Sequence, residues 1–136
     1  MFVLLSRFQC RAAVASSLYI KLVNVSTIPQ SPETLLEELF SIFPQYRANY
    51  RGSIHDDLPT YHSVLIAFMP FFGEESASFS PKQLKHFGAL VNAAVAEDGE
   101  LENAFGTCLL EHLHQIRAER ALRPYLSDLA RKKAHA

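Results

Sequence analysis

The chain has 136 residues, 49% of them hydrophobic and 20% charged, with a formal net charge of −1. This composition is typical of a single globular domain and argues against a disordered or fibrous protein. Its two cysteines, Cys10 and Cys108, are too few for a disulfide framework, so we expect a reducing, cytoplasmic setting. No apolar run approaches the length of a transmembrane helix, so we expect no membrane partner.

The charge is unevenly distributed along the chain. Residues 1–32 contain no acid and carry a charge of +3, and residues 117–136 carry +4. Residues 33–116 hold twelve acids against four basic residues, which gives −8. An acidic middle repels nucleic acid and attracts basic partners. The basic C-terminal segment is explained by a final helix, whose negative dipole end favours cations.

The first thirty residues differ in composition from the rest. They mix Arg, Ser and Ala with apolar residues and lack acids. A mitochondrial-type targeting segment shares this composition, whereas a secretory signal fits less well because Arg7 and Arg11 interrupt its apolar core. We interpret residues 1–30 as an irregular extension outside the core, with a targeting segment as the alternative. Residues 31–136 are predicted to form one helical domain.

The first predicted helix begins in "SPETLLEELFSIF". Ser31 suits the N-cap and Pro32 the first helical position, where a missing N–H costs nothing. Apolar residues then recur at helical spacing up to Phe43, and Pro44 should end the helix. The following segment, "QYRANYRGSI", is interpreted as a linker.

The second predicted helix covers "LPTYHSVLIAFMPFF". Asp56 or Asp57 should cap it, with Pro59 just inside. Pro70 should kink or close it near its end. Its apolar residues surround the helix, which predicts a central position in the core. These residues are Leu58, Tyr61, Val64, Leu65, Phe68, Met69, Phe71 and Phe72.

The remaining helices are predicted from similar signals. Ser80 should cap a third helix that starts at Pro81, with Gln83 completing a capping box, and Asp98-Gly99 should stop it. A fourth helix is expected from Leu101 to Leu122 and a short fifth from Pro124. The predicted fold is therefore all-α, with four to five helices in an antiparallel, hairpin-packed bundle.

The stretch "CLLEHLHQI" concentrates the side chains that most resemble a chemical site. At about 100° per residue, Cys108 and His112 fall on the apolar side of the fourth helix and His114 on the opposite side. The simplest interpretation is that Cys108 is a small buried hydrophobe and His112 a hydrogen-bonded core histidine.

A metal-dependent, hydrolase-like domain is the alternative. Cys108 and His112 are four residues apart, as a pair of zinc ligands requires, but zinc needs further ligands. The only other cluster is "HDDLPTYH", so such a site would combine His55, Asp56, His62, Cys108 and His112. His55-Asp56 resembles the tandem His-Asp of metal-dependent phosphohydrolases, but helix capping also explains Asp56 and Asp57. The sequence shows neither a phosphate loop nor a zinc-protease motif, and we expect no metal and no cofactor.

The order of segments resembles a family of small, uncharacterised bacterial helical domains. The resemblance covers roughly residues 33–132 and rests on apolar spacing and caps. The matching positions are Phe43-Pro44, Leu58-Pro59 with Tyr61, Asp98, and Leu109-Leu110-Glu111 with Leu113. It implies an all-helical fold and carries no assigned activity. Some members resemble immunity proteins of bacterial toxin systems in size and acidity, which is an analogy only.

These observations predict a non-enzymatic protein-binding module. It would be immunity- or antitoxin-like and would recognise a basic partner through its acidic central region. Nucleic acid is not an expected partner. A third interpretation is a self-associating unit in which the second helix packs against a copy of itself. The candidate partner-binding residues are Asp56, Asp57, Glu97, Asp98, Glu100 and Glu102.

Overall fold

The computed structural model describes residues 28–50, 58–116 and 118–134. Within these ranges every regular element is a helix, which confirms the all-α prediction. The described segments contain more α-helices than the four to five predicted. These are α2 (Pro32–Ile42), α3 (Pro44–Asn49), α4 (Tyr61–Glu74), α5 (Pro81–Ala96), α6 (Glu100–Ala104), α7 (Ala118–Leu122) and α8 (Asp128–Ala134). Across these same ranges, no helix is both long and apolar enough to cross a membrane.

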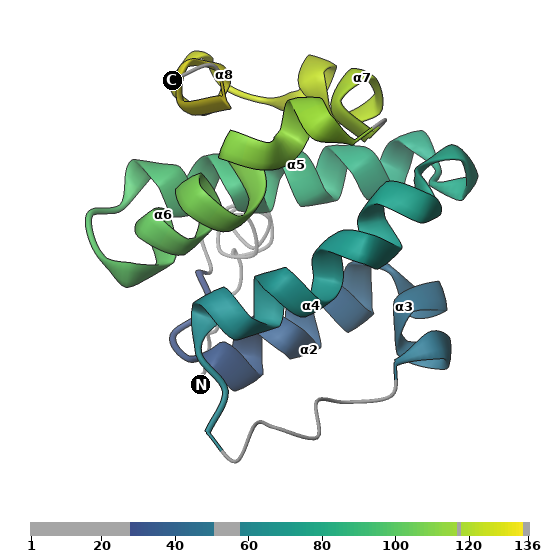
Figure 1. Ribbon diagram of the computed structural model, residues 1–136, viewed down its shortest axis with the longest axis horizontal. Coiled ribbons are helices and arrows are strands. Elements are labelled where there is room, and N and C mark those ends of the chain that lie inside the picture. The colour runs from purple at the N-terminus through teal and green to yellow at the C-terminus, as the bar shows by residue number, and fades with distance from the viewer. Residues whose placement is uncertain (1–27, 51–57, 117, 135–136) are drawn as a thin grey trace, which may run out of the picture.

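Helix α5 runs across the middle of the molecule and separates the other elements into two groups. Helices α2, α3 and α4 lie on one side of α5, and α7 and α8 lie on the other (Figure 1). Helix α6 folds back along α5 after a short turn, so the two form a hairpin.

Three helices begin with the same capping arrangement. Ser31, Thr60 and Ser80 are the N-caps of α2, α4 and α5, and each takes part in a reciprocal capping box. The predictions for Ser31 and Ser80 are confirmed. The prediction that Asp56 or Asp57 caps the second helix is wrong, because Thr60 Oγ1 accepts from the Ser63 N–H at 3.0 Å.

Helix α3 occupies part of the segment that was interpreted as a linker. Pro44 ends α2 and also takes the first position of α3, where proline is well tolerated. Gln83 ties the junction to α5, since its Nε2 donates to the Ile42 carbonyl at 3.0 Å and to Gln45 Oε1 at 2.9 Å. This short helix brings Tyr46 into the core.

Part of the core is a cluster of aromatic rings between α2, α4 and α5. Phe43 lies at its centre, 4.6 Å from Phe79 and 5.6 Å from Phe87 between ring centroids. Phe68 and Phe72 of α4 are fully buried, but α4 is not surrounded by the core as predicted, because Ile66 on its outer face is 61% exposed. Leu58 also departs from the prediction, because it lies outside α4 and is 85% exposed. The helix does not close at Pro70 but continues to Glu74.

The predicted fourth helix, Leu101 to Leu122, is not continuous. After α6 the chain makes a π-helical segment (Phe105–Leu109) and a 3₁₀ segment (Leu110–Gln115), and it becomes extended at Ile116. A π-helical turn holds more residues than an α-turn, and a 3₁₀ turn holds fewer. The side chains that follow these turns are therefore rotated around the helix axis relative to their positions in a continuous α-helix. As a result Leu110 and Leu113 are buried while His112 is exposed, so the prediction of a core His112 is wrong.

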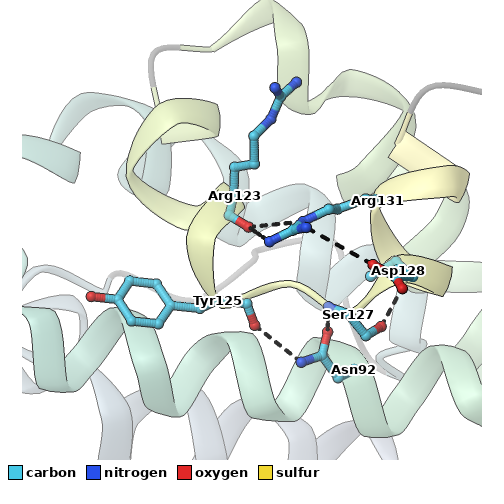
Figure 2. A network of polar contacts seen from close by, with 7 residues as sticks. Asn92, Arg123, Tyr125, Ser127, Asp128 and Arg131 are labelled. Carbon is cyan, nitrogen blue, oxygen red and sulfur yellow. Dashed lines mark hydrogen bonds and ion pairs between the residues drawn. The ribbon is translucent and has the colours of Figure 1, made fainter.

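The last helix starts later than predicted. A 3₁₀ turn spans Arg123–Tyr125, and α8 begins at Asp128, where Ser127 Oγ accepts from the Ala130 N–H at 3.2 Å. Asn92 of α5 fixes this connector, because its Nδ2 donates to the Tyr125 carbonyl at 3.0 Å and its Oδ1 accepts from the Ser127 N–H at 2.8 Å (Figure 2). The connector holds α8 against α5.

Candidate partner-binding surface

The turn between α5 and α6 presents three of the predicted partner-binding residues together. Glu97 is the C-cap of α5, Asp98 follows it, and Glu100 lies in the first turn of α6. All three are exposed. In the described part of the chain, none of them forms an ion pair. The structure therefore brings these carboxylates to one edge of the molecule with their charges unneutralised.

Glu33 joins this group from a distant part of the sequence. It lies in the first turn of α2, and it and Glu100 both influence Tyr61 at the start of α4. Partial burial raises the pKa of Tyr61, and the nearby carboxylates of Glu100 and Glu33 raise it further. We call Glu33, Glu97, Asp98 and Glu100 the acidic end. The sequence offered no signal for Glu33 as a member, because its electrostatic effect on Tyr61 depends on the tertiary fold.

The other predicted partner-binding residues stand apart from the acidic end. Glu102 Oε2 accepts from Lys133 Nζ at 2.7 Å, and the pair joins α6 to α8. The Glu102 carboxylate is therefore already paired within the molecule. Asp56 and Asp57 lie outside the described residues.

The basic residues of the C-terminal region lie on the opposite side of α5 from α2 and α4 (Figure 1). Several have contacts within that region: Arg123 pairs with Glu119 at 2.6 Å, and Arg131 lies 3.9 Å from Asp128. Arg131 also donates to the Arg123 carbonyl from Nε and from a terminal nitrogen, at 3.3 and 3.2 Å (Figure 2). These contacts brace the C-terminal turns.

The residues of the metal alternative do not converge where the structure describes them. His62 lies beside Asn103, with Nε2 and Nδ2 3.5 Å apart, in a hollow next to Glu100. Cys108 and His112 line a different, apolar hollow, and His112 Nδ1 lies 3.4 Å from Gln115 Oε1. Among the described residues, no three His, Cys, Asp or Glu side chains are placed to hold a metal ion. His55 and Asp56 lie outside those residues.

A second surface feature was missed by the sequence analysis. Two hollows, of about 350 and 360 Å³, flank α4 and share Tyr46, Tyr50 and Ala67 as lining residues. Glutamates line both hollows. We call the two together the tyrosine groove. It was not predicted, because Tyr46 and Tyr50 lie in the segment that was interpreted as a linker.

Comparisons with known proteins identify no relative. No protein-family model matches the chain, and neither a curated protein nor a solved structure matches it. The resemblance to small bacterial helical domains therefore stays a prediction.

Proposed function

We propose that this protein is a non-enzymatic binding module that recognises a basic protein partner through its acidic end. The observation that carries the proposal is the group of exposed carboxylates Glu97, Asp98 and Glu100 at the turn between α5 and α6, with the exposed Glu33 acting on the same Tyr61 as Glu100. These carboxylates come from two separate parts of the chain and have no ion-pair partner among the residues described.

Exposed like charges held close together repel one another, and a cationic partner relieves that repulsion. A single exposed ion pair contributes only about 0–1 kcal/mol, so affinity would need additional contacts. The combined field of several carboxylates acts at longer range and speeds encounter with a partner of opposite charge. Such recognition weakens as salt is added, because salt screens exposed charges over about 10 Å at 0.1 M.

An immunity- or antitoxin-like role is the specific form of this proposal. A small acidic domain suits the task of covering the basic surface of a toxin, since complementary fields favour fast association. The fold class alone does not imply that role. Its support is the charge segregation of the chain and the size of the domain.

The test is affinity capture of partners from the native host with the full chain as bait, at low and at high salt. The expected result is a basic protein that is retained at low salt and released at high salt. Glu100→Gln should weaken its capture, whereas Glu111→Gln, an exposed glutamate of the 3₁₀ segment, should not. Retention that is equal at both salt concentrations and in both variants would contradict the proposal.

A further inference from the structure

An apolar hollow of about 470 Å³ lies between α4 and the π-helical and 3₁₀ segments. Ile66, Met69 and Pro70 line its α4 side, and Thr107, Cys108 and His112 line the opposite side. The two sides belong to segments that pack directly against one another. The hollow is therefore built by the tertiary fold and not by one helix alone.

The hollow has a partly buried floor and an exposed rim. Met69, Cys108 and Ile116, which also lines it, are partly buried and pack against the core. Ile66 is 61% exposed, although it is one of the largest apolar side chains of α4. Exposed apolar side chains that gather around a recess commonly mark an interaction surface. Here a projecting apolar side chain lies beside an apolar recess.

The charge of this face decides which occupant it suits. None of the residues that line the hollow in the described part of the chain is Asp, Glu, Lys or Arg. A lysine or arginine of a basic partner would be desolvated there without a carboxylate to pair with. The centres of protein interfaces are depleted in charged residues. A second copy of the chain presents the same uncharged face, so the two faces meet without charge repulsion.

We propose that this face is an interface between two copies of the chain, related by a two-fold axis. In such an interface one patch serves both copies, so it must contain both a projection and the recess that receives it. Ile66 of each copy enters the hollow of the other and packs against its floor. The interpretation of the sequence as a self-associating unit thereby gains a specific face of α4.

This interface is separate from the acidic end, and salt acts on the two in different ways. Salt weakens the recognition of a basic partner, because it screens exposed charges. Apolar contact between two copies does not depend on such charges, and salt also screens any repulsion between their acidic ends. A single hollow with its rim makes a small interface, so we expect association that is weak and reversible.

Analytical ultracentrifugation of the full chain, from about 10 μM to about 1 mM, measures the association. We expect a monomer–dimer equilibrium that is not weakened by high salt. Ile66→Glu places a carboxylate in both halves of the interface and should weaken dimerisation at least about tenfold. Leu58→Glu is the matched control, because it adds the same charge at an exposed leucine that does not line the hollow. It should leave dimerisation unchanged.

Two further measurements support the interpretation of these variants. Both substituted positions are exposed, so the Tm of each variant at low protein concentration should match that of the wild type. In a Cys10→Ser background, a maleimide should react with the free thiol of Cys108 more slowly as protein concentration rises, because the second copy covers the hollow. With Ile66→Glu added, this rate should not depend on concentration.

A wild type that stays monomeric at about 1 mM would overturn the inference. So would a dimer that Ile66→Glu and Leu58→Glu weaken equally, or that neither weakens. Protection of Cys108 at every concentration in a monomeric protein would assign the hollow to another segment of the same chain and exclude the second copy. None of these results bears on the acidic end, which is tested by Glu100→Gln and by release of the basic partner at high salt.

Discussion

Gly88 of α5 lies directly against the backbone of Tyr125. A Cβ atom placed on Gly88 would lie 2.7 Å from Tyr125 Cβ and 2.8 Å from the Tyr125 carbonyl oxygen. Separations under 3.0 Å are not tolerated by real Cβ atoms, and a backbone oxygen cannot move aside as a flexible side chain does. The connector before α8 therefore approaches α5 closely only because residue 88 has no side chain.

Gly88→Ala should destabilise the fold by about 1–3 kcal/mol, the usual cost of overpacking, even though alanine favours helices. Chemical denaturation measures the change. Gly106→Ala is the control, because a Cβ there meets nothing within 4 Å. It should be neutral or stabilising by up to about 1 kcal/mol. Equal effects of the two substitutions would show that the contact with Tyr125 does not matter.

Asn92 lies one helical turn beyond Gly88 and bonds the same connector through both ends of its carboxamide (Figure 2). Asn92→Ala leaves two part-buried backbone groups unpaired and should cost about 1–3 kcal/mol. Asn92→Asp keeps the acceptor for Ser127 but loses the donor to Tyr125, so it should also destabilise. Urea unfolding of both variants, with the exposed Asn103→Ala as control, tests this. If Asn92→Ala left the free energy of unfolding unchanged, Asn92 would not stabilise the connector as described.

The features predicted correctly from the sequence are those set by neighbouring residues. The N-cap at Ser31 and the capping box at Ser80 depend on groups three residues apart, so their signals are complete within a few positions. At Pro44 the local signal was ambiguous. A proline that ends one helix is equally suited to begin another, and only the buried environment of Tyr46 decides in favour of α3.

The features that were missed depend on tertiary structure. The face assignment of His112 assumed a constant 100° per residue, which the π-helical segment Phe105–Leu109 breaks before that position is reached. The shared effect of Glu33 and Glu100 on Tyr61, and the hollows lined by Tyr46, depend on elements that are far apart in sequence. Periodicity along one segment carries no information about which other segment will pack beside it.

The pair formed by Glu102 and Lys133 should stabilise the docking of α8 more than an exposed pair would. Its side chains are 24% and 31% exposed at an N–O distance of 2.7 Å, whereas those of Glu37 and Arg47 are 68% and 62% exposed at 3.5 Å. A double-mutant cycle with Glu102→Gln and Lys133→Met should give a coupling of about 1 kcal/mol. The matched cycle at Glu37 and Arg47 should give less than about 0.5 kcal/mol. A larger coupling free energy for Glu37 and Arg47 than for Glu102 and Lys133 would contradict this prediction.

The buried hydroxyl of Tyr46 should make the fold sensitive to alkali. Burial, with a smaller effect of Tyr50, raises the pKa of Tyr46 to about 12 from 10.0. Below pH 10 the phenol is neutral in both the folded and the unfolded chain, so folding is not affected by its ionisation. Between pH 10 and 12 the unfolded chain releases this proton more readily than the folded one, so stability is lost as pH rises through this window.

Tyr46→Phe has no such proton and should escape this loss. At about pH 8 the variant should be more stable than the wild type by about 1 kcal/mol, because an unpaired buried hydroxyl has been removed. At about pH 11 its advantage should grow by about 1 kcal/mol more, since the wild type has then lost part of its stability. Urea unfolding at the two pH values measures the difference in unfolding free energy between the variant and the wild type at each pH. The other tyrosines and the lysines contribute equally to both proteins, so they cancel from this difference. An advantage that stayed constant with pH would mean that burial does not hold the Tyr46 phenol in its neutral form, which would contradict the prediction.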